Sequence, residues 1–268
     1  MNKEDKLGDQ LKSIEQAEAG RKCDASLPLM CRLDGKAFHT FTKGLQRPYD
    51  LRLSQLMIDT AKFLVEKTNA RLGYTQSDEI SLYWYNDPSE TETRQYMFDG
   101  KYQKLCSVLA GMASAYFSKE LAKRIPEKAD AVPVFDARVW NVELPDVYYN
   151  FLWRQDDAIK NSISMAAQAH FSSKQLHGVG SEEKKRMLRE IGKPWHLEPL
   201  HFKSGTFVKR QEILSRLTEE QLAKIPEKHR PDADVPVKRS VVSELDVGYL
   251  TGHDHGELLK LFPCVSES

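Results

Sequence analysis

Closely spaced cysteines are missing from this 268-residue sequence. Its four cysteines, Cys23, Cys31, Cys106 and Cys264, include no C-x-x-C pair, which argues against a zinc knuckle or a disulfide framework. No apolar run reaches the length of a membrane span, and the charged first twenty residues have no signal-peptide core. These absences predict a cytoplasmic protein without a membrane segment.

Net charge is also missing, because 39 basic residues balance 39 acidic ones. A protein without a global positive field must hold any polyanion through local patches of basic side chains. The length is sufficient for one large domain or two small ones with a sizeable core.

Hydrophobic periodicity in the first 144 residues predicts the element order βαββαβ. The first strand alternates over residues 27–34, and Asp50 is the expected N-cap of the helix that follows. The later elements are expected at residues 50–69, 70–75, 80–85, 98–124 and 134–144. This order is typical of a ferredoxin-like antiparallel sheet with both helices on one face, so the other face is predicted to be free for a substrate.

The second half of the chain is expected to be a mixed helical and β part, which makes the whole fold α+β. A long helix is predicted at 146–172 and a short basic helix at 181–192. Strands are predicted near 205–212 and 235–245, with the charged segment 216–234 as an exposed excursion between them.

Two acidic motifs fall at strand ends that this fold makes neighbours. Asp34 closes the first strand, and Asp78 lies at the tip of the hairpin formed by the next two strands. Two aspartates and the carbonyl of Gly35 are oxygen ligands that suit Mg²⁺. A pair of such ions about 3.5 to 4 Å apart would support an in-line phosphoryl displacement. Backbone N–H groups of the turn 36–39 are expected to point at a triphosphate.

Both motifs also have an ordinary structural interpretation. An acid followed by glycine is usually a turn, and Ser-Asp-Glu at a hairpin tip is usually solvated. Nearby basic residues are candidates for neutralising phosphate, although lysines on helices are most often merely solvated. These candidates are Arg32, Lys36, Lys43, Lys101 and Lys104.

Several stretches taken together resemble one known family. The stretches are RLDGKAFHTFTKG (32–44), GYTQSDEISL (73–82), KYQKLCSVLAGMAS (101–114), FDARV (135–139) and LWRQDD (152–157). They are similar to the tRNA-histidine guanylyltransferase family of reverse-polarity nucleotidyltransferases. The combination of RLDG-x-x-FH-x-F with QSDE is the specific part of this resemblance.

The resemblance implies a palm-type catalytic domain over residues 1–144 that adds nucleotides to the 5′ end of tRNA in the 3′-to-5′ direction, after ATP or GTP activates that end. Residues 145–268 are expected to contribute to RNA binding and to a homo-oligomer, a tetramer in the family. By motif, Asp34 and Asp78 would hold two Mg²⁺ ions with the Gly35 carbonyl, and Glu79 would be an acid beside them. Nucleotide or phosphate contacts are expected from Arg32, Gly35, Lys36, Ala37, Phe38, His39, Lys43, Ser77, Lys101, Lys104 and Asn161.

One departure separates the chain from part of the family. Eukaryotic members that add one guanosine to tRNA-histidine carry His-Ile-Asn-Asn-Leu-Tyr-Asn after Trp-Arg-Gln, whereas residues 158–164 read AIKNSIS. The missing histidine favours the subgroup that resembles bacterial and archaeal members, which repair 5′-truncated tRNA by templated addition. An asparagine-rich segment is also replaced, by GKPWHLEPLHF at 192–202, where His196 and His201 are expected to be structural hydrogen-bonding residues.

Two rival functions are consistent with the same residues. A palm-type nucleotide cyclase or other phosphoryl transferase would need the acids but no RNA. A non-catalytic RNA-binding relative would need only the fold, and it would have no reason to keep Asp34, Asp78 and Glu79 together.

Three further features have two interpretations each. The aromatic run Tyr83 to Tyr85 is expected to pack in the core instead of stacking on bases. The run from His253 to His255 is expected to be a turn instead of a metal site. Arg154 in the long helix is a candidate phosphate contact.

Overall fold

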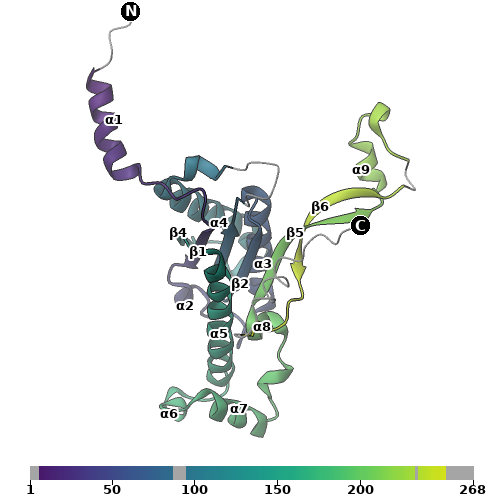
Figure 1. The fold of residues 1–268 in the computed structure, drawn as a ribbon. Helices are drawn as coiled ribbons and strands as arrows, with labels where there is room; N and C mark the ends of the chain where they lie inside the picture. Colours follow the sequence, from purple (N-terminus) through teal and green to yellow (C-terminus); the bar gives the residue numbers. More distant parts are fainter. Residues whose placement is uncertain (1–5, 87–94, 233–234, 252–268) are drawn as a thin grey trace, which may run out of the picture.

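A computed structural model describes residues 6–86, 95–232 and 235–251. Within these residues, one sheet contains six antiparallel strands in the order β4-β1-β3-β2-β5-β6 (Figure 1). The first four strands are β1 (Leu29–Gly35), β2 (Leu72–Gln76), β3 (Glu79–Trp84) and β4 (Phe135–Asn141). Together with the two helices between them they confirm the predicted βαββαβ order and the α+β class.

Helices α3 (Leu51–Thr68) and α4 (Tyr102–Arg124) cover one face of this sheet. The alternation of β1 explains the packing, because Cys31 and Leu33 point into the core that both helices share. Asp50 begins α3 as predicted, and its side chain accepts a hydrogen bond from the backbone N–H of Arg52 at 3.0 Å.

The other face of the sheet is partly covered, so the prediction that it is free is wrong over much of its area. Helix α5 (Leu144–Gln168) lies on this face and packs Val147 and Phe151 against Tyr74 and Tyr83 (Figure 1). The sequence prediction missed this contact because it assigned α5 to a separate part of the chain. The face remains accessible near the start of β4, where the side chains of Asp136 and Arg138 are each 54% exposed.

The second half of the chain extends the same sheet. Strand β5 (Thr206–Ser215) pairs with β2 and with β6 (Val237–Leu245). The β5–β6 hairpin runs away from the body of the molecule and carries the short helix α9 (Glu219–Ala223) at its far end (Figure 1). The segment 216–232 lies mostly at the surface, in agreement with the predicted excursion.

Four further helices lie outside this sheet and its two covering layers. Helix α1 (Lys6–Ala19) projects from the body and buries none of its residues (Figure 1). The short helices α6 (Ser173–Leu176) and α7 (Ser181–Glu190) follow α5, and α8 (Leu200–Ser204) leads into β5. The division into a catalytic domain at 1–144 and a second part at 145–268 stays a prediction.

Several smaller expectations have clear outcomes. Tyr83 and Trp84 are buried, on opposite faces of the sheet, which confirms their packing role. The three described cysteines, Cys23, Cys31 and Cys106, are free thiols, and no helix among the described residues is long and apolar enough to cross a membrane. The run from His253 to His255 lies outside the described residues.

Candidate active site

The candidate site lies where β1 ends beside the β2–β3 hairpin. Asp34 of β1 is directly opposite Glu79 of β3, and it is also opposite Asp136 of β4. One residue further on, the backbone N–H of Gly35 donates a hydrogen bond to the carbonyl oxygen of Asp78 at 3.1 Å. Asp34 and Asp78 are 44 positions apart in sequence. The sheet nevertheless places Asp34, near the end of β1, beside Asp78 in the β2–β3 turn.

Ser77 and Asp78 form the two-residue turn of the β2–β3 hairpin, and Ser77 has a left-handed φ of 50°. Burial raises the pKa of the Asp78 carboxyl, and the neighbouring Asp34 carboxylate raises it further. A hydrogen bond from the Ser77 side chain and the positive charge of His39 oppose this rise. Two close carboxylates without a cation between them repel each other, so this pair favours a bound positive ion.

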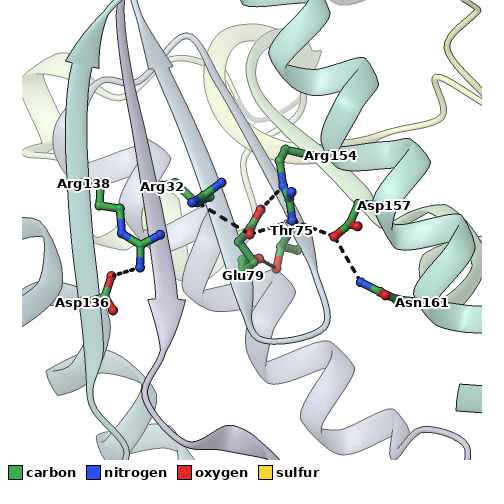
Figure 2. A network of polar contacts seen from close by, with 8 residues as sticks. All are labelled: Arg32, Thr75, Glu79, Asp136, Arg138, Arg154, Asp157 and Asn161. Atoms are coloured by element: carbon green, nitrogen blue, oxygen red, sulfur yellow. Dashed lines mark hydrogen bonds and ion pairs between the residues drawn. The ribbon is translucent and has the colours of Figure 1, made fainter. Parts of the chain in front are cut away.

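Glu79 differs from these two acids because an arginine neutralises it. Arg154 of α5 donates from Nε to Glu79 Oε1 at 2.6 Å and from Nη2 to Glu79 Oε2 at 2.8 Å (Figure 2). Burial raises the pKa of Glu79, while the charges of Arg154 and Arg32 oppose that rise. The Arg154 guanidinium is thus held by protein carboxylates, and this pairing replaces the phosphate contact predicted for it.

A short chain of polar contacts continues along α5 from this ion pair. Arg154 also donates to Asp157 at 3.0 Å, and Asp157 in turn accepts a hydrogen bond from Asn161 at 3.1 Å (Figure 2). The predicted nucleotide contact Asn161 is therefore linked to Glu79 through two residues. Asp157 was missed by the sequence prediction, although its place three residues after Arg154 on a helix was a usable signal.

The turn after Gly35 offers fewer amide groups than predicted. The N–H of Gly35 is taken by Asp78, and the N–H of Lys36 donates to the carbonyl oxygen of Val134 at 2.9 Å. The amides of Ala37, Phe38 and His39 begin the short helix α2 (Phe38–Phe41) and donate no hydrogen bond within the described chain. Any anion held by backbone N–H groups here is therefore limited to these three.

Gly35 itself is required by packing. A Cβ at this position would lie 2.3 Å from Cδ2 of Phe38, which no side chain can accommodate without a shift of the ring. Phe38 is fixed in turn by ring contacts with Phe117 and Phe135 at centroid distances of 5.6 and 5.2 Å. The absence of a side chain at Gly35 thus keeps the end of β1 tight against an aromatic core.

A cavity of about 430 Å³ opens beside Asp78. Its polar rim includes Asp78 and Ser77 together with the exposed side chains of His39, Lys43 and Asn161. Apolar side chains form the other part of the wall, among them Leu45, Met57, Ile58, Met165 and Phe202. An apolar wall with a few convergent polar groups is typical of a small-molecule pocket of this size.

Residues 158–164, where this chain departs from the histidine motif, form part of the same cavity. Ala158, Asn161 and Ser162 line it from α5, and α8 contributes His201. The Nε2 atom of His201 is buried and has no hydrogen-bond partner among the described residues, and burial lowers the pKa of this imidazole. The structural hydrogen bond expected for His201 is therefore not present.

Lys101 and Lys104 lie at the other end of the sheet, so their predicted grouping with the aspartates is wrong within a single chain. The backbone of Lys101 forms an isolated β-bridge with Lys22. The hydroxyl of the next residue, Tyr102, donates a hydrogen bond to Asn141, which is opposite Leu29 at the start of β1. From this point helix α4 runs towards the end of the sheet that carries Asp34. Its first turn is therefore about the length of β1 away from Asp34.

The donor set at the site fits a hard divalent cation. Asp34, Asp78 and the carbonyl of Gly35 offer only oxygen atoms, and Mg²⁺ commonly takes one or two carboxylates and completes its shell with water and substrate phosphates. Within the described residues, no three His, Cys, Asp or Glu side chains converge closely enough to hold a metal by themselves. Such a site would thus depend on oxygens supplied by a nucleotide.

Comparison with known proteins gives a consistent result. The profile of the family described as tRNAHis guanylyltransferase matches residues 9–143. A bacterial tRNA(His) guanylyltransferase (Thg1)-like protein in complex with ATP is 37% identical with a TM-score of 0.72, and the match covers 76% of this chain and 88% of that one. The same type of bacterial protein in complex with GTP is 30% identical with a TM-score of 0.69 and coverages of 90% and 91%. The tRNA(His) guanylyltransferase of Saccharomyces cerevisiae is 30% identical over 71% of this chain and 87% of its own length.

Proposed function

The chain belongs to the tRNAHis guanylyltransferase family, and we propose that it adds nucleotides to the 5′ end of tRNA in the 3′-to-5′ direction as a templated repair enzyme. In this reaction a 5′-monophosphate end attacks the α-phosphorus of ATP or GTP, and pyrophosphate leaves. The 3′-hydroxyl of an incoming nucleoside triphosphate then attacks the 5′ phosphorus of the RNA, and the activating nucleoside monophosphate leaves.

One observation carries this proposal. The sheet brings Asp34, near the end of β1, together with Asp78 in the β2–β3 turn. A cavity of about 430 Å³ with an apolar wall lies beside Asp78. Paired acids with oxygen-only neighbours are suited to phosphoryl transfer, because that chemistry depends on positioning and electrostatic stabilisation instead of a protein nucleophile.

The nucleotide is proposed to occupy the cavity with its base on the apolar wall and its phosphates at the polar rim. His39, Lys43 and Ser77 lie at this rim, with the amides of Ala37, Phe38 and His39 close to Asp78. Lys36 is exposed beside the same turn and adds positive charge there. This arrangement would leave the triphosphate next to the two aspartates.

Asp34, Asp78 and the Gly35 carbonyl are proposed to hold the two Mg²⁺ ions. Bound Mg²⁺ supplies neutralisation of phosphate charge and activation of the attacking hydroxyl. Glu79 is not proposed as a ligand, since both of its oxygens accept hydrogen bonds from Arg154. Its role is to fix α5 against the hairpin that carries Asp78.

Three further parts of the proposal concern the surroundings of the site. RNA is expected to be held mainly by phosphate contacts from basic residues of the second half, such as the exposed Lys160, Lys174 and Lys193. A homo-oligomer, with tetramers as the expected state, would bring additional surface to one tRNA. A cytoplasmic location fits both the substrate and the free thiols.

Templated repair is preferred to single-guanosine addition because of residues 158–164. This segment contains no histidine, and Ala158 stands on the cavity wall with a small, apolar side chain. Both bacterial structures described above resemble this chain over most of its length. A site without a dedicated histidine is expected to let the opposite RNA strand decide which nucleotide is added.

The test uses 5′-monophosphorylated tRNA-histidine, intact and lacking its first nucleotide, with Mg²⁺, ATP and each nucleoside triphosphate. Extension that restores the base pair dictated by the opposite strand, on more than one tRNA, supports the proposal. Guanosine addition to intact tRNA-histidine alone would replace repair with the single-addition role. A cyclic product from nucleotide without RNA would support the rival cyclase function.

A further inference from the structure

An exposed tryptophan lies near the acids and is not among the residues that line the nucleotide cavity. Trp153 of α5 is 54% exposed, an unusual state for the largest apolar side chain. Its ring contacts two guanidinium groups, with Cζ of Arg154 at 4.6 Å and Cζ of Arg32 at 5.7 Å from the ring centroid. Cation–π contacts of this kind hold the ring in place.

This ring is tied to the catalytic acids through Arg154. The same guanidinium that lies against Trp153 makes the double hydrogen bond to Glu79, which is directly opposite Asp34. The ring is therefore held in a defined position relative to Asp34 while a large part of it stays accessible.

Arg32, which contacts the tryptophan, has a second arginine directly opposite it on the neighbouring strand. Arg32 of β1 is opposite Arg138 of β4, and both lie two residues from the opposed pair Asp34 and Asp136. Figure 2 shows Arg32, Arg138 and Asp136 on these two strands. Like charges in direct cross-strand register are unfavourable unless an anion lies between them. Their carboxylate contacts are long, at 3.8 Å from Arg32 to Glu79 and 3.4 Å from Arg138 to Asp136, so both guanidiniums remain available to a phosphate.

A second aromatic continues the exposed strip along α5. Tyr149 lies one turn before Trp153 on the same helix face and is 45% exposed. None of Trp153, Tyr149, Arg32 and Arg138 lines the nucleotide cavity. Besides the nucleotide cavity at Asp78, the site therefore has a separate exposed strip of aromatic and arginine side chains.

We propose that Trp153 is the stacking platform for the base at the 5′ end of the acceptor RNA, with Arg32 and Arg138 on a backbone phosphate next to that base. Aromatic faces beside arginines are the common means of holding unpaired nucleotides without sequence preference. This absence of preference suits an enzyme that must accept any 5′ nucleotide. The inference rests on the proposed function, since it assigns the second substrate of the same site.

The test places 2-aminopurine at the 5′ end of a 5′-monophosphorylated tRNA that lacks its first nucleotide, and follows its fluorescence in the full-length protein. Stacking on Trp153 should quench the probe, and Trp153→Ala should remove the quench and weaken RNA binding by about 10- to 100-fold. Trp153→Phe should restore most of both. ATP affinity, measured by calorimetry, should be unchanged in these variants.

A matched control is Phe98→Ala, which removes a similarly exposed aromatic at the opposite end of the sheet and should change neither signal. Arg138→Met should reduce the salt dependence of RNA binding by about one phosphate contact. A Trp153→Ala protein that binds and extends RNA like the wild type would overturn this inference alone. Loss of ATP binding in Trp153→Ala would reassign the ring to the nucleotide, and a wild-type protein that binds ATP but no RNA would overturn the proposed function as well.

Discussion

Asp34 and Glu79 are directly opposite each other on β1 and β3, yet only Glu79 is neutralised by an arginine. Among the residues that the structure describes, no ion pair involves Asp34. The difference separates two acids that look equivalent in sequence. Asp34 is left available to a cation and a substrate, whereas Glu79 connects the hairpin to α5.

Asp34→Asn and Asp78→Asn should each reduce 5′ extension by at least about 100-fold, because each removes a negative oxygen ligand from the proposed metal site. Both variants should fold, since asparagine keeps the size of the side chain. Single-turnover extension assays measure the effect. Asp130→Asn, which alters an exposed aspartate in the loop after α4, is the matched control and should be fully active.

The Asp78→Asn variant should also change how stability depends on pH. Burial, assisted by Asp34, raises the pKa of Asp78, so the native state holds this proton more tightly than the unfolded chain. The contribution of this group to stability is then complete below the unfolded pKa and is lost as the pH rises through the raised native pKa.

Urea unfolding without divalent metal, between about pH 3 and pH 7, measures this dependence. Asp78→Asn should gain stability relative to the wild type as the pH rises. A variant that instead loses relative stability towards neutral pH would show that the Asp78 carboxylate is stabilised in the native state.

Removing one partner of the Glu79–Arg154 pair should be strongly destabilising. Glu79→Met and Arg154→Met should each lower the free energy of unfolding by about 3 to 5 kcal/mol, because the remaining charge is buried without its partner. The double variant should lose clearly less than the sum of the two. Arg186→Met breaks a solvent-exposed pair with Glu183 and should leave the free energy of unfolding nearly unchanged. Additive losses in the double variant would contradict the coupling.

Gly35→Ala should destabilise the protein by about 1 to 3 kcal/mol, because the added methyl group overlaps the Phe38 ring. Phe38 belongs to the turn that is proposed to face the nucleotide. Displacement of its ring should shift this turn, so ATP affinity should fall as well. Gly111→Ala is the control, since a Cβ there meets no atom within 4 Å inside α4. That substitution should stabilise the protein by up to about 1 kcal/mol. Thermal unfolding and calorimetry of ATP binding would measure the two effects.

Filling the cavity should weaken nucleotide binding without unfolding the protein. Met165→Trp adds bulk to the cavity wall from a half-buried position on α5, and it should weaken ATP binding by at least about 10-fold. Lys160→Trp places the same side chain at an exposed position of α5 that does not line the cavity, and it should bind ATP normally. Equal ATP affinity in both variants would place the nucleotide elsewhere.

Local sequence patterns were enough to predict the secondary-structure elements and to identify the acidic motifs. Alternation in β1 and the apolar stripe of α3 are encoded by neighbouring residues, so their periods could be read directly. The βαββαβ order then implied that Asp34 and Asp78 would be adjacent, and the register of β1 with β3 places them so. The family resemblance rested on the same residues and agrees with the comparisons.

The groups that surround those acids depend instead on how distant segments pack together. Arg154 contacts Glu79 because α5 packs on the second face of the sheet, a long-range choice that no local period encodes. Lys101 lies far from the site because α4 starts at the opposite end, although its sequence motif looked like that of a phosphate-binding residue. The cavity likewise needs α3, α5 and α8 to meet. Such contacts depend on the summed packing of distant segments, which is why the sequence could name the acids and could not name their partners.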